Sequence, residues 1–362
     1  MNILILANND VGLYQFRREL IEELRKEHQV SISLPDGSLV RPLEKMGCRF
    51  FDTKMERRGI NPVQDMDLFL RYCGLIRRVR PDLVLTYTIK PNIYGGLACR
   101  LMGIPYAANI TGLGTAFQRR GALRKLVVTL YRLALKRAKT VFFENEENRQ
   151  TLLAEKIVLP EQCRLLSGAG VNLEYYACAP YPEEDSPVRF LFVGRVMAEK
   201  GVDELFAAME HLQKDGIDCT LDVLGFFEEQ YEEKIHRAEE QGWLRYHGYQ
   251  KDVRPFIAAA HCFVLPSWHE GMANTNLECA AMGRPVITSR IHGCMEAVLE
   301  EKSGFLCRTQ DSESLYREMK RFCALPRDRR AAMGRAGRRH MEAVFDKRVV
   351  VSQTLEGIKN GI

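Results

Sequence analysis

The chain has 362 residues, of which 46% are hydrophobic and 27% charged; this composition is ordinary for a globular protein, and the length favours two domains over one core. It contains no run of about 18 apolar residues, and its opening residues MNILILANND lack the basic flank and cleavage site of a signal peptide, so we expect a cytosolic protein without a membrane span. The 11 cysteines are odd in number and never form Cys-x-x-Cys, which argues against a disulfide framework or a zinc site.

The net charge of +5 conceals an asymmetry between the two halves of the chain. Residues 1–170 contain 27 Lys and Arg against 17 Asp and Glu, a balance of +10, whereas residues 171–362 contain 25 against 30, a balance of −5. A basic half can bind nucleic acid or an anionic membrane. We disfavour nucleic acid, because no helix-turn-helix, zinc-finger or aromatic RNA-binding signature accompanies the charge.

Strands and helices are predicted to alternate through the first half of the chain. Apolar runs predict strands at residues 2–7, 30–34, 49–51, 83–87, 106–110 and 140–144. Apolar residues at helical spacing predict helices at residues 14–28, 39–46, 63–79 and 91–102, and in the basic stretch before residue 140. This alternation predicts a parallel sheet with helices on both faces.

The pattern is interrupted near Ser167, where small residues, prolines and acids without a period indicate a linker. A second alternation follows, with strands expected at residues 189–194, 219–225, 245–248, 262–266 and 285–288 and helices at residues 202–212, 229–241 and 252–260. From residue 325 onward the chain is predicted to be helical without strands.

These patterns predict an α/β protein with two Rossmann-like, doubly wound domains that face each other across a cleft. The expected domains are residues 1–170 and 188–340, joined by a linker at residues 171–187. A helical tail at residues 341–362 either caps the second domain or crosses back to the first. Ligands of doubly wound sheets bind beyond the carboxyl ends of the strands, so the loops after the strands are the candidate binding loops.

A basic stretch between Gln118 and Phe143 contains eight Lys and Arg and no acid. Leucine, valine and tyrosine are interleaved with these cations at helical spacing, which is typical of a helix lying on an anionic membrane surface, where each cation contributes about 1 kcal/mol. The alternative is an ordinary solvated helix face. The residues expected to contact the membrane are Arg119, Arg120, Arg124, Lys125, Arg132 and Lys136.

The most specific stretch of the sequence is PSWHEGMANTNLECAAMGRPVIT, residues 266–288. Glu270 precedes a glycine turn that opens a helix, and Glu278 projects from an early turn of that helix; their carboxylates can accept hydrogen bonds from the hydroxyls of a sugar and a ribose. The alternative is a helix-capping Glu270 and a surface Glu278. Backbone N–H groups at the helix N-terminus can bind phosphate, and they belong to Gly271, Met272, Ala273, Asn274 and Thr275.

A second candidate loop has the sequence VGRVMAEKG, residues 193–201. Gly194 ends an apolar run, and Arg195 and Lys200 follow it. Two cations on a strand-to-helix loop can bind a diphosphate, since arginine supplies a planar fork and lysine a point charge. Two exposed basic loop residues without a ligand are the alternative.

In combination, the two loops resemble the retaining, nucleotide-sugar-dependent glycosyltransferases of family 4, which have the GT-B fold. The carrying features are Glu270-x7-Glu278, the following CAAMGRPVIT, and GRVMAEKG at residues 194–201. Within that family, TYTIKPNIYGGLACRLMGIP and NITGLGTAF are similar to the bacterial subgroup that extends surface polysaccharides or glycans on a polyprenyl diphosphate carrier.

The resemblance implies roles for individual residues on the donor side. Glu278 would hold the ribose hydroxyls of the donor nucleotide, and Glu270 would contact the hydroxyls of the donor sugar. Arg195 and Lys200 would stabilise the diphosphate leaving group. The segment 245–250, with His247 and Gly248, is similar to the strand and loop beside the nucleobase. His247 and also His269 are more simply explained as hydrogen-bonding residues than as bases.

The sequence gives weaker indications of the residues that bind the acceptor. The candidates follow the strands of the first domain: Asp10, Gly12, Tyr14, Lys90, Asn92, Thr111 and Gly112. Asp10 can orient an acceptor hydroxyl or can simply cap a helix. Lys90 can meet a carrier diphosphate or can be a solvated lysine. A histidine that some family members have in the loop of NITGLGTAF is absent, which leaves a histidine-based acceptor role without support.

We expect no metal and no cofactor. Asp65-Met66-Asp67 resembles the metal site of the other large glycosyltransferase fold, but it lies at a predicted helix start, where acids complement the helix dipole. The glycines at 112–114 and 168–170 do not complete G-x-G-x-x-G, which disfavours a dehydrogenase.

The sequence therefore predicts a retaining glycosyltransferase that moves a sugar from a nucleotide diphosphate sugar, most simply UDP-linked, to a polyprenyl-diphosphate-linked saccharide at the inner face of the plasma membrane. No obligate protein partner is inferred. A nucleotide-sugar epimerase on the same fold and a non-catalytic membrane-docking subunit are the alternatives.

Overall fold

The computed structural model describes residues 1–56, 61–114, 117, 121–183 and 187–359. The chain forms two compact units. Unit 1 comprises Met1–Ala169 and Arg348–Ile362, and unit 2 comprises Gly170–Lys347. The end of the helical tail therefore belongs to unit 1, although the chain reaches it only after completing unit 2.

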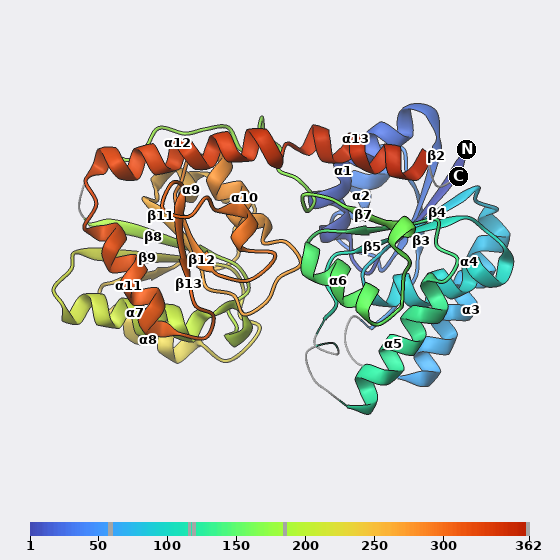
Figure 1. Cartoon of the computed structure of the whole chain (residues 1–362), viewed down its shortest axis with the longest axis horizontal. Coiled ribbons are helices and arrows are strands. Elements are labelled where there is room, and N and C mark those ends of the chain that lie inside the picture. Colours follow the sequence, from blue (N-terminus) through green and yellow to red (C-terminus); the bar gives the residue numbers. More distant parts are fainter. Residues whose placement is uncertain (57–60, 115–116, 118–120, 184–186, 360–362) are drawn as a thin grey trace. The chain divides into compact units, whose positions relative to one another are not determined.

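Unit 1 contains a seven-stranded sheet in the order β3-β2-β1-β4-β5-β6-β7, and every neighbouring pair is parallel (Figure 1). Its strands are β1 (Asn2–Leu6), β2 (Gln29–Leu34), β3 (Arg49–Asp52), β4 (Leu83–Tyr87), β5 (Tyr106–Ile110), β6 (Thr140–Phe143) and β7 (Cys163–Leu165). This is the doubly wound order, in which the direction of connection reverses between β1 and β4. The short edge strand β7 was not predicted from the sequence.

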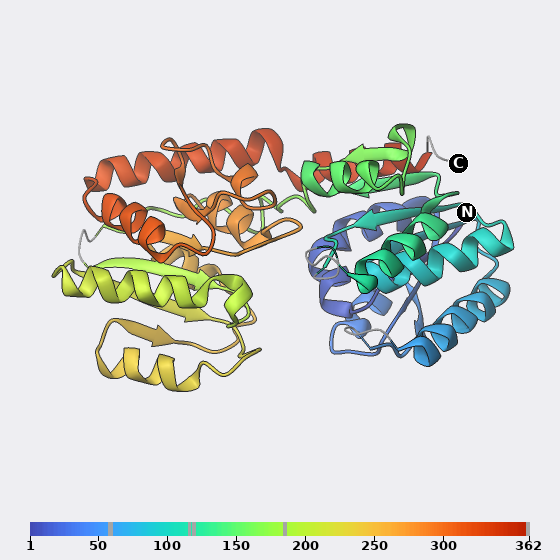
Figure 2. The same ribbon diagram turned by 60° about the horizontal axis from the view of Figure 1, so that its bottom comes forward.

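The helices of unit 1 are α1 (Asp10–Glu27), α2 (Val40–Lys45), α3 (Pro62–Val79), α4 (Gly96–Met102), α5 (Ala122–Leu135), α6 (Glu146–Ala154) and α13 (Lys347–Lys359), with a π-helical turn η1 (Pro91–Gly95) and a 3-10 turn η3 (Pro160–Gln162). Helices cover both faces of the sheet, so its strands are buried on both sides. Successive residues of a strand point to opposite faces. In β1, Ile3 and Ile5 join a core with α1, α2 and α13, whereas Leu4 and Leu6 join a core with α3, α4 and α5. Helices α3, α4 and α5 lie side by side over one face of the sheet (Figure 2).

Helix α1 begins at Asp10, four residues before the predicted start. The Asn9 side chain caps it by accepting a 2.5 Å hydrogen bond from the Gly12 N–H. Helix α3 has a similar start, where Asn61 is the cap and Pro62 the first residue. The capping residue marks the true start of each helix, whereas apolar spacing alone places a helix start only to within a few residues.

Unit 2 contains a six-stranded parallel sheet in the order β10-β9-β8-β11-β12-β13. Its strands are β8 (Val188–Val193), β9 (Cys219–Leu224), β10 (Leu244–Tyr246), β11 (Cys262–Leu265), β12 (Val286–Ser289) and β13 (Gly304–Cys307). The five strands predicted for this half are present, and β13 is an additional edge strand. The order repeats the doubly wound topology of unit 1, with its reversal between β8 and β11.

The helices of unit 2 are α7 (Val202–Lys214), α8 (Glu232–Glu240), α9 (Arg254–Ala259), α10 (Asn274–Ala281), α11 (Ser312–Cys323) and α12 (Arg327–Val344), with 3-10 turns η4 (Ala198–Lys200) and η5 (Met295–Ala297). A single apolar core joins the helices on both faces to the sheet. No described helix of the structure combines the length and the apolar composition needed to span a bilayer.

The segment expected as a linker is ordered over most of its length within unit 2. The Val171 N–H donates to the Phe345 carbonyl at 2.8 Å, and the Lys347 N–H donates to the Val171 carbonyl at 3.0 Å. Further along, the fully buried Arg284 guanidinium donates to the carbonyls of Ala179 and Pro180 at 3.2 and 2.6 Å. Residues 184–186 lie outside the described residues.

Candidate active site

The loops after β8 and β11 meet at one point of the unit 2 sheet. The two strands are neighbours, with Phe190 opposite Cys262 and Leu191 opposite Phe263. They flank the point at which the order of connection reverses, which is where doubly wound sheets bind their ligands. The two loops singled out in the sequence, after Val193 and after Leu265, therefore begin at the expected edge.

An ion pair joins these two loops. The Lys200 ammonium contacts the Glu270 carboxylate, and both side chains are mostly buried. The Ser267 hydroxyl donates a 2.8 Å hydrogen bond to the same Glu270 oxygen. The structure thus brings together the two side chains that were predicted to act on a diphosphate sugar. Their opposite charges form a mostly buried ion pair.

Trp268 fastens the loop after β11 to the segment that follows β8. Its backbone N–H donates to the Glu199 carbonyl at 3.0 Å, and its indole N–H donates to the Glu204 carboxylate at 3.1 Å. Burial raises the pKa of Glu204 above its ordinary value. The close approach of the loops also requires Gly201, since a Cβ atom built there would lie 2.1 Å from the Pro266 carbonyl oxygen.

The loop after β12 packs against the turn that contains Glu270. Gly293 has a left-handed φ of 88°, and a Cβ atom there would lie 2.6 Å from the Glu270 carbonyl oxygen and 2.8 Å from that of Gly271. The Gly293 carbonyl accepts a 2.7 Å hydrogen bond from the Ala273 N–H. The buried Asn276 side chain donates to the Thr288 hydroxyl at 3.1 Å and so ties α10 to β12.

This support changes one expectation about the N-terminus of α10. The Ala273 N–H was predicted to bind phosphate, but it is committed to Gly293. Met272 and Ala273 bury their side chains in the core. Gly271, Asn274 and Thr275 are half-buried beside them, and the buried Oδ1 of Asn274 has no hydrogen-bond partner among the described residues.

Arg195 follows Gly194 directly after β8 but does not join the Lys200–Glu270 pair. Its guanidinium lies 3.7 Å from the Glu228 carboxylate, on the loop after β9, and its side chain is 39% exposed. The two cations predicted to flank a diphosphate therefore have different partners and different exposure. Lys200 is the buried member of the two.

Glu278 lies on α10 and is half-buried. Burial and the neighbouring Glu278 charge raise the pKa of the Tyr176 hydroxyl. Removal from water raises the pKa of Glu278 to about 7, against the opposing effects of Tyr176 and of the Lys347 charge. Glu278 is thus not the exposed surface acid that was one alternative from the sequence.

His247 lies at the end of β10 and is engaged within unit 2. Its Nε2 atom lies 2.6 Å from the Asp222 carboxylate, and its backbone N–H donates to the Val223 carbonyl at 3.0 Å. The Gly248 carbonyl accepts from the Gly225 N–H at 2.9 Å. The predicted reading of a base by main-chain groups cannot use the His247 N–H, which is already paired. His269, also assigned a hydrogen-bonding role, lies 3.5 Å from the Glu199 carboxylate.

In unit 1, two of the predicted acceptor residues, Asp10 and Gly12, lie at the start of α1. The buried Asp10 carboxylate accepts from the backbone N–H groups of Val11 and Leu39 at 2.9 and 2.7 Å, so it fixes the loop after β2. The Gly12 N–H is the group capped by Asn9. The Asp10 carboxylate and the Gly12 N–H are thus engaged within unit 1, and the cap of α1 is Asn9 rather than Asp10.

Two further acceptor candidates are also internal. Lys90 lies 2.9 Å from the Asp65 carboxylate, and the two side chains are only 12% and 6% exposed. Lys90 is therefore a mostly buried ion-pair partner rather than a solvated lysine, and Asp65 is a buried ion-pair partner rather than an acid that merely complements a helix dipole. Asn92 is fully buried, with its amide bonded to Thr86 at 2.7 Å and to the Asn109 carbonyl at 2.9 Å.

The remaining acceptor candidates, Tyr14, Thr111 and Gly112, are half-buried and follow β1 and β5 at the carboxyl edge of the unit 1 sheet. The same edge contains a buried ion pair that the sequence analysis missed, between Arg17 of α1 and Glu144 after β6. The Arg17 guanidinium also lies 5.2 Å from the centre of the buried Tyr87 ring.

The basic helix is α5, and its cations divide into two kinds. Arg124 is paired with Glu155 at 2.5 Å, and Arg132 donates to the Glu155 carbonyl at 2.6 Å, so both hold the end of α6. Lys125 and Lys136 are exposed. Leucines with about half their surface exposed lie on the same helix, namely Leu123, Leu126 and Leu133 at 51%, 47% and 44%. Arg119 and Arg120, also predicted to contact a membrane, lie outside the described residues.

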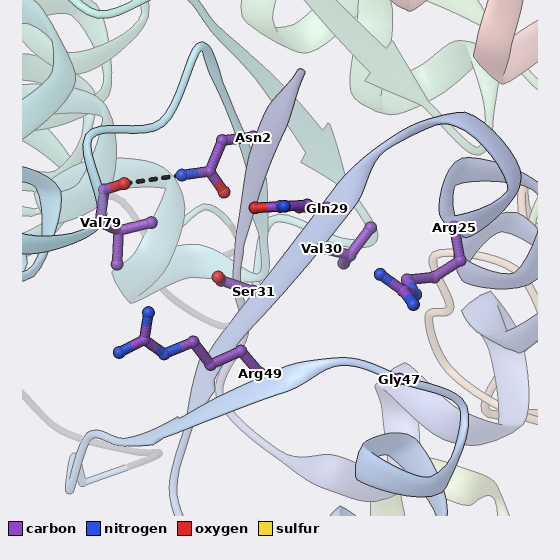
Figure 3. A pocket seen from close by; sticks show the side chains of 8 residues that line it. All are labelled: Asn2, Arg25, Gln29, Val30, Ser31, Gly47, Arg49 and Val79. Carbon is purple, nitrogen blue, oxygen red and sulfur yellow. Dashed lines mark hydrogen bonds between the residues drawn. The ribbon is translucent and has the colours of Figure 1, made fainter.

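A cavity of about 250 Å³ opens at the opposite, amino end of the unit 1 sheet (Figure 3). It is lined by Asn2, Arg25, Gln29, Val30, Ser31, Gly47, Arg49 and Val79. The Asn2 amide is turned to the Val79 carbonyl, to which it donates at 2.6 Å. This cavity lacks the paired acids and cations of the unit 2 loops. The described residues contain no cluster of three or more His, Cys, Asp or Glu suited to a metal ion.

Two family models match the chain, one in each unit. The model for glycosyl transferase 4-like proteins matches residues 2–145, and the model for glycosyl transferases group 1 matches residues 187–324. Together they account for most of both sheets and for every donor-side residue singled out above. The chain belongs to this glycosyltransferase family.

Two curated relatives match this glycosyltransferase over most of their length. The N,N'-diacetylbacillosaminyl-diphospho-undecaprenol alpha-1,3-N-acetylgalactosaminyltransferase of Campylobacter jejuni is 25% identical over 87% of this chain and 87% of its own. The UDP-Gal:alpha-D-GlcNAc-diphosphoundecaprenol alpha-1,3-galactosyltransferase of Escherichia coli is 27% identical over 81% of this chain and 80% of its own. Among solved structures, Anabaena HepE in complex with UDP-glucose has a TM-score of 0.82 at 17% identity, covering 99% of both chains, which establishes the GT-B fold.

Several residues at the candidate site of this glycosyltransferase were missed by sequence reasoning. Ser267 and Trp268 are inside the motif but drew no attention beside Glu270. Asn276 carried a usable signal, because it is a polar residue on the buried face of α10. Tyr176 lies far from the motif in sequence and carried no local signal, and Gly293, just beyond the end of the motif at Thr288, was not singled out.

Proposed function

We propose that this glycosyltransferase transfers a sugar from a UDP-sugar to a saccharide carried on polyprenyl diphosphate, with retention of the anomeric configuration, at a membrane surface. The observation that carries the proposal is the contact of Lys200 with Glu270 where the loops after β8 and β11 meet. It is supported by the lipid-linked acceptors in the names of both curated relatives and by the UDP donor in the name of the Escherichia coli relative.

On the donor side, Glu278 accepts hydrogen bonds from the ribose hydroxyls and Glu270 contacts the sugar hydroxyls. Lys200 and Arg195 stabilise the diphosphate, assisted by N–H groups at the start of α10. When the diphosphate arrives, Lys200 exchanges part of its contact with Glu270 for a contact with a phosphate oxygen. Glu270 is thereby released to accept from a sugar hydroxyl, so donor binding and sugar positioning are linked.

The bond that breaks joins the anomeric carbon to the β-phosphate oxygen, and its electron pair leaves with UDP. Positive charge develops on the sugar and negative charge on the departing diphosphate, so a fixed cation such as Lys200 lowers the barrier. The acceptor hydroxyl attacks the same face of the sugar and gives its proton to the departing phosphate. In this scheme the protein cations provide the positive potential, and no divalent ion is needed.

The acceptor is expected at the carboxyl edge of the unit 1 sheet, near Tyr14, Thr111 and Gly112. Helix α5 supports attachment to an anionic leaflet, because Lys125 and Lys136 lie among exposed leucines that can enter the acyl boundary. The protein is then a peripheral enzyme on the inner face of the plasma membrane.

The test is a screen of labelled UDP-sugars against short polyprenyl diphosphate saccharides, with EDTA added to half of the reactions. We expect sugar transfer with at least one pair, unchanged by EDTA, and an α-linked product from an α-linked donor. Turnover of the donor without an acceptor into an epimeric nucleotide sugar would favour an epimerase instead. Absence of any turnover by a folded protein that binds no UDP would overturn the proposal.

A further inference from the structure

Helix α3 presents a stripe of apolar side chains on its outer face. Leu68 and Tyr72 face inward and are buried, whereas Val63, Met66 and Leu70 are 79%, 57% and 59% exposed. Residues at i, i+3 and i+7 lie on one face of a helix, so the three exposed side chains form a continuous stripe. Surface helices normally place polar residues on this side, and a run of exposed apolar residues marks a face that contacts another apolar phase.

The stripe begins at the carboxyl edge of the unit 1 sheet. Asp65 lies in the first turn of α3, between Val63 and Met66 in sequence, and its carboxylate lies 2.9 Å from the Lys90 ammonium. Lys90 comes three residues after the end of β4, and the residues that follow parallel strands meet at the carboxyl edge of a sheet. This buried ion pair therefore holds the first turn of α3 at the edge where the acceptor is expected.

Helix α5 adds apolar side chains at the same end of unit 1. Its first turns contain Leu123 and Leu126, each about half exposed, and the exposed Lys125 lies between them in sequence. The turn η1, which follows Lys90, packs against both α3 and α5. The two helices begin at the same end of unit 1 (Figure 1). We call the exposed apolar residues of the two helices the α3–α5 apolar face: Val63, Met66, Leu70, Leu123 and Leu126.

The charges on these helices favour an anionic lipid surface as the partner of this face. The first acid of α3 is the buried partner of Lys90, its second acid, Asp67, is paired with Arg71 at 2.7 Å, and α5 contains no acid. An exposed Arg77 continues the α3 stripe beyond its last apolar residue. Apolar side chains flanked by cations are typical of helices that enter the acyl boundary of an anionic leaflet. A second copy of this chain would instead bring the same cations together.

We propose that the α3–α5 apolar face inserts into the acyl boundary of an anionic leaflet and seats the acceptor edge of unit 1 against the membrane. This inference deepens the proposed function, in which the cations of α5 attach the enzyme to the leaflet. The cations supply an attraction that salt screens, whereas the apolar face supplies a contribution that salt does not screen. A saccharide on polyprenyl diphosphate projects from the headgroup layer, so an edge seated there meets it while the polyprenyl chain stays in the bilayer.

The experiment measures sedimentation of the full-length protein with vesicles that contain about 30% anionic lipid. Met66→Gln/Leu70→Gln removes two apolar side chains and replaces them with a residue of similar length and helix propensity. The matched control is Leu101→Gln/Leu159→Gln, because these leucines are similarly exposed, at 70% and 56%, but precede β5 and β7 at the amino edge of the sheet.

We expect Met66→Gln/Leu70→Gln to weaken vesicle binding at least about tenfold, since burial of half of each apolar side chain contributes about this much. The control should bind as the wild type does. Part of the wild-type binding should persist at high salt and should be absent from Met66→Gln/Leu70→Gln. All three proteins should turn over a water-soluble acceptor equally, whereas transfer to an acceptor embedded in vesicles should fall only in Met66→Gln/Leu70→Gln.

A tryptophan probe reports directly which side chains meet the lipid. Leu70→Trp and Leu101→Trp each add one tryptophan to the two native ones, Trp243 and Trp268. Lipids brominated in their acyl chains should quench the emission added at residue 70 and leave the emission added at residue 101 unchanged.

Equal vesicle binding by the wild type and Met66→Gln/Leu70→Gln would overturn the inference, as would equal losses in the two double variants or equal quenching at both probe positions. A wild type that is dimeric in solution and becomes monomeric in Met66→Gln/Leu70→Gln would overturn it too, because a second copy would then cover the stripe. A wild type that transfers no sugar to any acceptor would overturn the proposed function alone, since vesicle binding and quenching are measured without a reaction.

Discussion

The ammonium group of Lys200 contacts the carboxylate of Glu270, which lies 70 residues further along the chain. Both groups are held by the loops that leave two neighbouring strands, and the Ser267 hydroxyl, from the same loop as Glu270, donates to the Glu270 carboxylate. A cation positioned in advance needs little reorganisation when negative charge appears beside it. The pair is therefore a fixed electrostatic element of the candidate active site.

Replacing Lys200 with alanine is expected to lower kcat for sugar transfer by about 10²- to 10³-fold, because one stabilising group for the departing diphosphate is lost. The measurement is the initial rate at saturating donor. Lys214→Ala is the control, since Lys214 is an exposed lysine at the end of α7. A Lys200→Ala enzyme with the wild-type kcat would contradict the assignment.

The affinity for UDP should rise with pH through neutrality. Burial raises the pKa of Glu278 to about 7, so this group changes from acid to carboxylate in the neutral range. A charged carboxylate accepts hydrogen bonds from ribose hydroxyls more strongly than the neutral acid does. Calorimetry at several pH values checks this expectation, and Glu278→Gln, which cannot titrate, should bind weakly with a flat profile. A wild-type profile as flat as that of the variant would refute it.

The raised pKa of Glu278 also affects stability, in the opposite direction: its contribution to the free energy of unfolding should fall as pH rises. Its pKa is about 7 in the folded protein and 4.5 for an ordinary glutamate, so between these values the folded state binds more protons than the unfolded state. The free energy of unfolding contributed by Glu278 therefore decreases as pH rises through that window. In urea denaturation, Glu278→Gln should gain stability relative to the wild type as pH increases. A difference that does not change with pH would show that Glu278 titrates normally.

Gly293→Ala is expected to abolish most of the activity and to lower the unfolding midpoint. The new methyl group would press on the Glu270 and Gly271 carbonyl oxygens and displace the turn that carries Glu270. Gly216→Ala is the matched control, because Gly216 also has a positive φ, of 68°, but open space around its missing side chain. Both variants share the cost of a left-handed alanine, about 1 kcal/mol. Equal losses of activity in the two would show that the contact with the Glu270 turn is irrelevant.

The alternation of strands and helices could be predicted because it is recorded in local patterns. The residues of β4, LVLTY, are buried on both faces, so they form a continuous apolar run, while the helices show one apolar stripe each. The strands β7 and β13 were missed because three or four residues at a sheet edge give too short a pattern. The order of the sheets followed from the rules of doubly wound folds rather than from any single residue.

The candidate site was predictable in its loops but not in its pairings. Glu270 and Lys200 were found because each belongs to a motif that follows a strand. The partners of Lys90 and Arg17 were not, because each partner lies on another element, and a single sequence contains no distances. A signal was present for Arg17, which interrupts the apolar stripe of α1 and therefore needed a buried partner.

Charge reversal of Lys125 and Lys136 to glutamate is expected to reduce binding to vesicles with 30% anionic lipid, since each cation contributes about 1 kcal/mol near such a surface. Turnover of a short, water-soluble acceptor should be unchanged. The control is the same double reversal at Lys214 and Lys251, which are exposed lysines of unit 2. Arg124 and Arg132 are left intact because they hold α6. Equal vesicle binding by both double variants would make α5 an ordinary solvated helix.

Lys90→Ala is expected to destabilise unit 1 rather than to impair catalysis directly. Removal of the ammonium leaves the buried Asp65 carboxylate with its charge unpaired, and breaking a buried pair in this way costs about 3–5 kcal/mol. A second change, Asp65→Asn, removes that charge and should restore much of the loss in the Lys90→Ala/Asp65→Asn protein. Urea denaturation monitored by far-UV circular dichroism measures both effects. Below the unfolding transition, turnover per folded molecule should match the wild type in the double variant. An unfolding midpoint that does not move, together with a large fall in kcat, would contradict this expectation and would favour a role for Lys90 at the acceptor site.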